Sequence, residues 1–272
     1  MVGVDRRQSL GTGGGNDGHD DAQRASRHSY RAEPGARRTR QAAFSDRIHA
    51  GQQLAANLQQ FAGDSSVVVL SISRGGAVVG SVIAEALGSD IPHLYYVVRA
   101  IPCATIPRLS LGSVAGDGSV RVDNALAKSM GFDASDGGSM SWLMQSIEDI
   151  DEELSSEQAR FHLPAPTSEA LQGKTLIVVD DGIEAGDIMR EAIMHLRHCY
   201  QASKIVVAVP VCLADLRKQL QRHVACVVDI VSPIFVGSIA RWYALGVVAS
   251  EAEQRALSRM FAGVADSGFD VE

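Results

Sequence analysis

Short apolar runs alternate with amphipathic segments along most of this sequence, and this alternation restricts the fold more than any other feature. The runs are five or six residues long and rich in valine and isoleucine, which is typical of strands buried on both faces of a sheet. Strands that alternate with helices favour right-handed crossovers and therefore a parallel sheet. The expected strands are residues 67–72, 94–98, 175–179, 204–209 and 225–230.

Helices are expected between these strands, where apolar residues recur at helical spacing. A hairpin is expected at residues 111–122, because its centre, Gly116-Asp117-Gly118, is a strong turn signal. The predicted fold class is α/β, with an open, mainly parallel sheet and helices on both faces. The expected helices are residues 45–61, 77–87 and 213–220, with two more around 143–154 and 189–196.

Composition excludes several classes of protein. The chain has 272 residues, 46% of them hydrophobic, which is enough for a sizeable core. It has no run of about 18 apolar residues and no basic-then-apolar leader, so we expect no membrane span and a cytoplasmic location. The net charge of −7 argues against nucleic acid as the main partner of the folded part. Reduced thiols are expected at four widely spaced cysteines: Cys103, Cys199, Cys212 and Cys226.

The N-terminal segment differs from the rest of the chain. Its first forty residues contain eight arginines, five acidic residues and almost no large apolar side chains. Such a segment cannot bury enough surface to offset its ordering entropy, so we interpret residues 1–41 as a disordered tail. Its arginines are the one place where nucleic acid could bind. The folded domain is expected at residues 42–262, followed by a C-terminal tail at residues 263–272.

Three connecting loops are candidates for the functional site, because ligands of such sheets bind beyond the carboxyl ends of the strands. The loop at residues 73–76 offers Arg74 and two glycines, which allow close approach of the backbone to an anionic ligand. The loop at residues 99–108 offers two further arginines, Arg99 and Arg108. The third loop is residues 180–187.

The third loop carries the strongest signal. Asp180 and Asp181 directly follow an expected strand, and a turn then leads into a helix. The carboxylates can hold sugar hydroxyls, and the backbone N–H groups of the turn can hold a phosphate. The alternative is an acidic strand end with Asp187 as a helix N-cap. The spacing leaves both interpretations open.

Taken together, the three loops resemble those of the type I phosphoribosyltransferases. The resemblance spans about residues 44–250 and none of the N-terminal tail. It is carried by Ser73-Arg74-Gly75-Gly76-Ala77, Arg99-Ala100-Ile101-Pro102, Leu111-Gly112-Ser113-Val114 and Val179-Asp180-Asp181-Gly182-Ile183-Glu184-Ala185-Gly186-Asp187-Ile188.

The resemblance implies a substrate, phosphoribosyl pyrophosphate or a related phosphorylated ribose, with magnesium as the cofactor and a nitrogenous base as the acceptor. Asp180, Asp181 and Arg99 would be catalytic, and the two acids would also be the metal ligands. By analogy alone, the resemblance also implies a homodimer. The implied substrate-binding residues are Arg74, Gly75, Gly76, Arg108, Gly182, Ile183, Glu184, Ala185, Gly186, Asp187 and Ile188.

The turn after Asp181 departs from the family pattern. Ala185 and Ile188 replace two threonines, and each lost hydroxyl bond to a charged phosphate costs about 1.5–3 kcal/mol. Glu184 and Asp187 add negative charge, and like charges about 4 Å apart repel by about 4 kcal/mol at an effective dielectric of about 20. Two functions therefore compete: a working transferase, or a catalytically degenerate relative that binds a ligand or regulates. A cation such as Arg108 beside the two acids would favour the first, and acids that cap the helix would favour the second.

Other residues have simpler interpretations. His195 and His198 share a helix face with no third ligand nearby, which indicates a surface pair rather than a metal site. Trp142 and Trp242 are expected to be packing residues, and Trp242-Tyr243 could also shape a base pocket. The sequence has no G-x-G-x-x-G after a strand and no G-x-S-x-G, which argues against a nicotinamide enzyme and a serine hydrolase.

Overall fold

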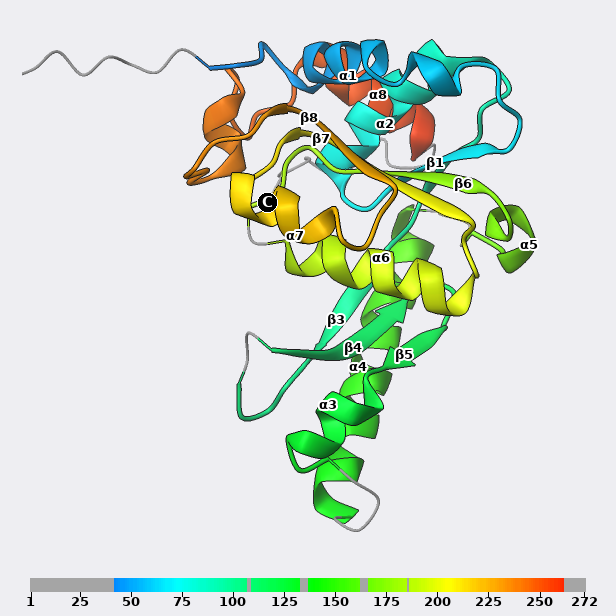
Figure 1. Ribbon diagram of the computed structural model, residues 1–272, viewed down its shortest axis with the longest axis vertical. Coiled ribbons are helices and arrows are strands. Elements are labelled where there is room, and N and C mark those ends of the chain that lie inside the picture. The colour runs from blue at the N-terminus through cyan, green and yellow to red at the C-terminus, as the bar shows by residue number, and fades with distance from the viewer. Residues whose placement is uncertain (1–41, 107–108, 133–136, 162–165, 185, 262–272) are drawn as a thin grey trace, which may run out of the picture. The chain divides into compact units, whose positions relative to one another are not determined.

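Five parallel strands form the main sheet, in the order β2-β1-β6-β7-β8 (Figure 1). β6 lies at the centre, between β1 and β7, and its residues 176–179 are fully buried. The predicted fold class, α/β with a mainly parallel sheet, is confirmed. The strands are β1 (Val67–Ser71), β2 (His93–Tyr95), β6 (Thr175–Val179), β7 (Lys204–Val211) and β8 (Cys226–Val231).

The structure, a computed structural model, describes residues 42–106, 109–132, 137–161, 166–184 and 186–261. The two expected tails, residues 1–41 and 263–272, lie outside the described residues. The helices are α1 (Arg47–Ala56), η1 (Gln59–Phe61), α2 (Arg74–Leu87), α3 (Asn124–Ser129), α4 (Gly137–Phe161), α5 (Ser168–Leu171), α6 (Asp187–Cys199), α7 (Ala214–Leu220), η2 (Ile239–Trp242) and α8 (Glu251–Met260).

Side chains that alternate along each strand build a core on both faces of the sheet. In β1, Val67 and Val69 pack against α1 and α2, whereas Val68 and Leu70 face the side of α6 and α7. This alternation follows from the two-residue repeat of a strand. The valine-rich runs therefore bury both faces, as the sequence predicts.

A second, antiparallel sheet lies beside α6 and α4 (Figure 1). It contains β3 (Val98–Pro102), β4 (Ser110–Ala115) and β5 (Val120–Val122), and we call it the small sheet. The expected hairpin is confirmed as β4 and β5. The expected strand 94–98 is wrong as a single element, because the chain leaves the main sheet after β2 and enters the small sheet at Val98. An unbroken apolar run contains no signal for such a change of sheet.

Polar side chains of α6 join the small sheet to the main sheet. Glu191 forms a buried ion pair with Arg121 of β5. His195 hydrogen-bonds through Nδ1 with Ser113 Oγ at 3.0 Å and through Nε2 with Ser119 Oγ at 2.8 Å. The expectation of a surface histidine pair is therefore wrong for His195, which is fully buried, and right only for the exposed His198.

Membrane-spanning helices and the state of the cysteines are the two expectations from composition that the described residues address. Across these ranges, no helix combines the length and the apolar character that a membrane crossing needs. All four cysteines are free thiols, with Cys103 and Cys212 buried and Cys199 and Cys226 half-buried.

The burial of His195 predicts a stability that falls in acid. Burial lowers the pKa of His195 to about 4, from the ordinary value of 6.5. The unfolded chain therefore takes up this proton first as the pH falls, and stability present above pH 6.5 is lost between pH 6.5 and 4. The linkage relation gives a loss of about 2 kcal/mol at pH 5 from this group. Denaturant unfolding at pH 7 and pH 5 measures the loss, which His195→Gln should reduce and His198→Gln should leave unchanged. An equal pH dependence in the wild type and His195→Gln would contradict this assignment.

Candidate functional site

The ends of β1 and β6 meet at the start of α2. Ser73 is the N-cap of α2, and its Oγ accepts a hydrogen bond from Gly76 N at 2.9 Å. The same hydroxyl donates to Asp180 Oδ1 at 2.5 Å, and Asp181 N donates to that oxygen at 2.8 Å. Asp180 is thus held by both strand ends, at the carboxyl edge where parallel sheets bind ligands.

The expected loop at residues 73–76 is the N-cap and first turn of α2. The helix begins at Arg74 rather than at the expected Ala77, so Arg74, Gly75 and Gly76 are helical. A tertiary contact explains why residue 75 is glycine: a Cβ there would lie 2.1 Å from Asp181 Oδ2. Only glycine lets the Asp181 carboxylate lie against this turn.

The two adjacent acids face different surroundings. Asp181 Oδ2 accepts a hydrogen bond from Arg47 Nε of α1 at 2.7 Å, and Asp181 O accepts one from Tyr243 Oη at 2.6 Å. Burial, and after it the charge of Asp181, raises the pKa of Asp180 well above its usual range. The Asp181 carboxylate therefore has a cationic partner, and Asp180 favours its protonated form.

Arg99 lies on a strand and not in a loop, which corrects the prediction for residues 99–108. It belongs to β3, and its Nη2 donates to Glu157 Oε2 of α4 at 2.8 Å. This ion pair is half-buried and aligns Arg99 along the small sheet. The other arginine of that segment, Arg108, lies outside the described residues.

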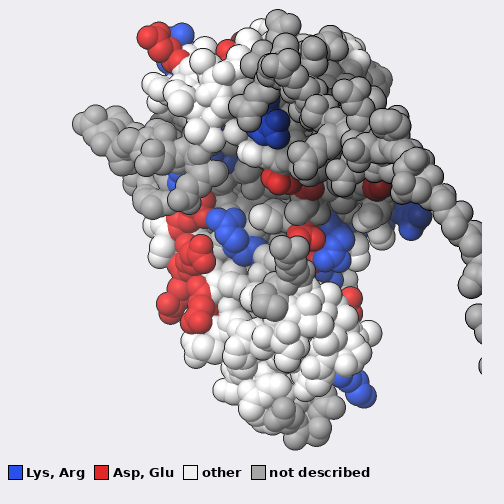
Figure 2. All heavy atoms as spheres, turned by 90° about the vertical axis from the view of Figure 1, so that its left-hand side faces the viewer, with Lys and Arg blue, Asp and Glu red and all other residues white. Residues whose placement is uncertain are grey.

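Tyr95, at the end of β2, marks the point where the predicted site residues come together. Burial is the main reason why the pKa of its hydroxyl is raised. The charges that also act on this hydroxyl belong to Glu157, Arg99, Arg74 and Asp180. One residue from each of the three predicted segments, Arg74, Arg99 and Asp180, therefore affects the pKa of this hydroxyl. Figure 2, which faces the carboxyl ends of the parallel strands, shows basic and acidic side chains side by side across the middle of this face.

The turn after Asp181 leads into α6 without a side-chain cap. Gly186, at φ 79°, is the N-cap, so the alternative that Asp187 caps the helix is wrong. This left-handed conformation suits glycine, and Asp187 is instead the first residue of α6. No side chain of the described residues caps α6, so its first N–H groups are open to an anion.

The remaining residues of the turn divide between the core and the surface. Gly182 is buried, and Ile183 N donates to Val211 O at 2.8 Å. Glu184, Asp187 and Ile188 are exposed. Ala185 lies outside the described residues.

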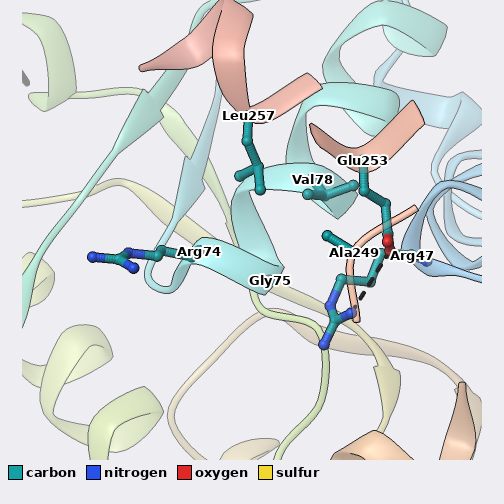
Figure 3. A pocket seen from close by; sticks show the side chains of 7 residues that line it. All are labelled: Arg47, Arg74, Gly75, Val78, Ala249, Glu253 and Leu257. Atoms are coloured by element: carbon teal, nitrogen blue, oxygen red, sulfur yellow. Dashed lines mark hydrogen bonds and ion pairs between the residues drawn. The ribbon is translucent and has the colours of Figure 1, made fainter. Parts of the chain in front are cut away.

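Two hollows lie beside α2. A cavity of about 10 Å³ lies beside the first turn of α2, between Arg47, Val78 and Leu257, and it has room for no more than one water molecule (Figure 3). A groove of about 820 Å³ lies between α1, α2 and α8 and contains none of the predicted site residues.

Several residues at this edge were not predicted. Arg47 carries no local motif, because it meets Asp181 and Glu253 only through the fold. Glu253 belongs to the capping box of α8, a local pattern that does not indicate its contact with Arg47. Ile234 and Phe235 follow β8 and are 93% and 72% exposed. Trp242 is buried and Trp142 packs half-buried against the core, which confirms the prediction for both. Tyr243 is also buried, and Phe235 is the accessible aromatic ring of that segment.

No protein-family model matches this chain. Two proteins named "Putative phosphoribosyl transferase", from the CDC 1551 and H37Rv strains of Mycobacterium tuberculosis, are each 29% identical over 201 residues. The match covers 74% of this chain and 43% of each relative, so the chain matches less than half the length of these relatives.

Among solved structures, the protein TT1426 from Thermus thermophilus aligns over 80% of this chain and 98% of its own, with a TM-score of 0.65 and 23% identity. That likeness concerns the fold alone. The resemblance to phosphoribosyltransferases is confirmed: the chain is a sequence relative of proteins named phosphoribosyl transferases and has the α/β fold that the resemblance implies.

Proposed function

We propose that the carboxyl edge of β1 and β6 binds phosphoribosyl pyrophosphate and transfers its phosphoribosyl group to a nitrogenous base. The observation that carries the proposal is the hydrogen bond from Ser73 to Asp180, which joins the ends of β1 and β6, and the charges of Arg74 and Arg99 act on Tyr95 together with that of Asp180. The open N-terminus of α6 follows the same strand end. An acid for sugar hydroxyls, cations for a diphosphate and amides for a phosphate are the groups that this ligand requires.

Each element has a role in this proposal. The N–H groups that begin α6 hold the 5-phosphate, because a helix N-terminus favours an anion. The first turn of α2 and Arg74 hold the pyrophosphate, and Arg99 adds positive charge beside it. Asp180 accepts hydrogen bonds from the ribose hydroxyls once it has lost its proton.

The acid pair suits magnesium that arrives with the substrate. Magnesium is usually held by one or two carboxylates together with substrate phosphates. No group of three His, Cys, Asp or Glu side chains within the described ranges forms a metal site of its own. Because the Asp181 carboxylate is paired with Arg47, Asp180 is the carboxylate that would contact the ion. When bound, magnesium would neutralise charge on the pyrophosphate.

The transfer needs positioning more than acid–base chemistry. A ring nitrogen of the base attacks the anomeric carbon, the bond from that carbon to the pyrophosphate oxygen breaks, and pyrophosphate leaves with the electron pair. The cations at α2 and β3 stabilise the negative charge that develops on the leaving group. The two phosphate sites hold the sugar in line for attack.

One observation favours the second candidate, a degenerate relative that binds its ligand without turnover. Glu184 and Asp187 are exposed at the start of α6, on the same turn as the amides that would hold the 5-phosphate. Solvent reduces their repulsion, since exposed charges interact through a high dielectric. For this second candidate, we expect weakened binding of the 5-phosphate and an intact Asp180 site.

Calorimetric titration of the full chain with phosphoribosyl pyrophosphate and magnesium chloride tests the proposal. We expect saturable binding, which Asp180→Asn weakens at least about tenfold because one ribose-binding carboxylate is lost. Asp215→Asn, on the exposed surface of α7, is the control and should bind like the wild type. Pyrophosphate release with a panel of bases then separates a transferase from a binding protein. The absence of heat up to about 1 mM ligand would refute both functions.

Gly75→Ala tests the close approach of Asp181 to α2. The new Cβ would lie 2.1 Å from Asp181 Oδ2 and 3.0 Å from Arg47 Nε, so the ion pair must move. We expect a lower melting temperature, although alanine is the better helix former by about 1 kcal/mol, and weaker ligand binding. The control is Gly137→Ala, at the first residue of α4, where a Cβ meets nothing within 4 Å. Equal melting temperatures for the two variants would show that Asp181 does not lie against this turn.

A further inference from the structure

Arg47 joins three segments that are far apart in the sequence. Its side chain is 5% exposed, and its Nε donates to Asp181 Oδ2 at 2.7 Å. Its Nη1 lies 3.7 Å from Glu253 Oε1, and its guanidinium carbon lies 4.8 Å from the ring centroid of Tyr243. One residue of α1 therefore contacts the end of β6, the start of α8 and the segment between them.

The partners of Arg47 are themselves held in place. Glu253 Oε1 accepts from the backbone N–H of Arg47 at 2.8 Å, and Glu253 Oε2 accepts from Ser250 N at 2.6 Å. The second bond completes the capping box of α8, which limits the motion of Glu253. Tyr243 Oη donates to the carbonyl of Asp181. Asp181 is thus restrained through both its side chain and its backbone.

The two sides of the acid pair differ in composition. Asp180 acts on Tyr95 together with Arg74 and Arg99, on the side of the small sheet. Asp181 contacts Arg47 and Tyr243, on the side of α1 and α8. Figure 3 shows that Arg74, from the first turn of α2, and Arg47, from α1, point in different directions. Both acids are held by the protein, Asp180 by Ser73 and the backbone N–H of Asp181, and Asp181 by Arg47.

We propose that Arg47 is a positioning residue that acts through Asp181: it holds the Asp181 carboxylate against the first turn of α2 and so fixes the strand end from which Asp180 would meet the ligand. The identity of the ligand rests on the proposed function, and the positioning role rests on the contacts of Arg47. A buried arginine with two carboxylates is costly to desolvate and gives little net stability, which favours a role beyond stability. If Arg47 served the fold alone, its replacement would lower stability without a specific link to Asp181.

A double-mutant cycle tests the link. The variants are Arg47→Lys, Asp181→Asn and the double variant, titrated with phosphoribosyl pyrophosphate and magnesium chloride. Lysine keeps the charge, so the protein should fold, but it lacks the Nε–H that Asp181 accepts. We expect Arg47→Lys to weaken binding about tenfold in the wild-type background and by no more than about twofold in the Asp181→Asn background.

The matched control is Arg217→Lys. Arg217 Nε of α7 donates to Asp229 Oδ1 of β8 at 2.7 Å, which is the same type of contact as that from Arg47 Nε to Asp181 Oδ2. This control should alter the melting temperature and leave ligand affinity unchanged. Equal losses of affinity from Arg47→Lys in both backgrounds, or no loss in the wild type, would overturn the proposal.

Hydrogen–deuterium exchange separates failure of this inference from failure of the proposed function. If the wild-type chain binds no phosphoribosyl pyrophosphate, the proposed function fails, and exchange at residues 180–183 judges the role of Arg47. We expect Arg47→Lys and Asp181→Asn each to speed exchange there, and the double variant to add nothing further. Additive effects on exchange would refute positioning through Asp181.

Discussion

The hydroxyl of Ser73 connects the two strand ends on which this site depends. It accepts from the first turn of α2 and donates to Asp180, so one side chain both caps the helix and holds the acid. The parallel pairing of β1 with β6 brings these residues together, because Ser71 lies opposite Val179 in the register. A shift of this register would separate Ser73 from Asp180 and break the hydrogen bond that joins the two strand ends.

Charge is distributed unevenly around that connection. Behind it, Arg47 neutralises Asp181, and in front of it Asp180 shares its surroundings with two arginines. The small sheet contributes one of those arginines, Arg99, and α6 holds this sheet in place through buried polar contacts at Glu191. Packing on one face of the main sheet thus determines where a cation of the second sheet lies. In the proposed function, the same helix, α6, binds the 5-phosphate at its N-terminus.

The sequence predicts the sheet better than the site. Unbroken valine-rich runs define β1 and β6 to within one residue, since burial on both faces leaves a local pattern. The first turn of α2 is missed because glycine is a poor helix former. Gly75 is needed there because the carboxylate of Asp181, which is distant in the sequence, packs against it. The burial of His195 is missed because the polar face of a helix usually meets solvent, whereas here the small sheet covers it. Arg47 is missed because a long-range ion pair leaves no local pattern.

The most direct test is a crystal structure of the full chain with phosphoribosyl pyrophosphate and magnesium bound. We expect ribose hydroxyls at Asp180, the 5-phosphate at the N-terminus of α6 and the pyrophosphate at the first turn of α2. Asp181 should still contact Arg47 in that complex. A sugar held by Asp181, or a ligand bound away from the ends of β1 and β6, would contradict the proposed function.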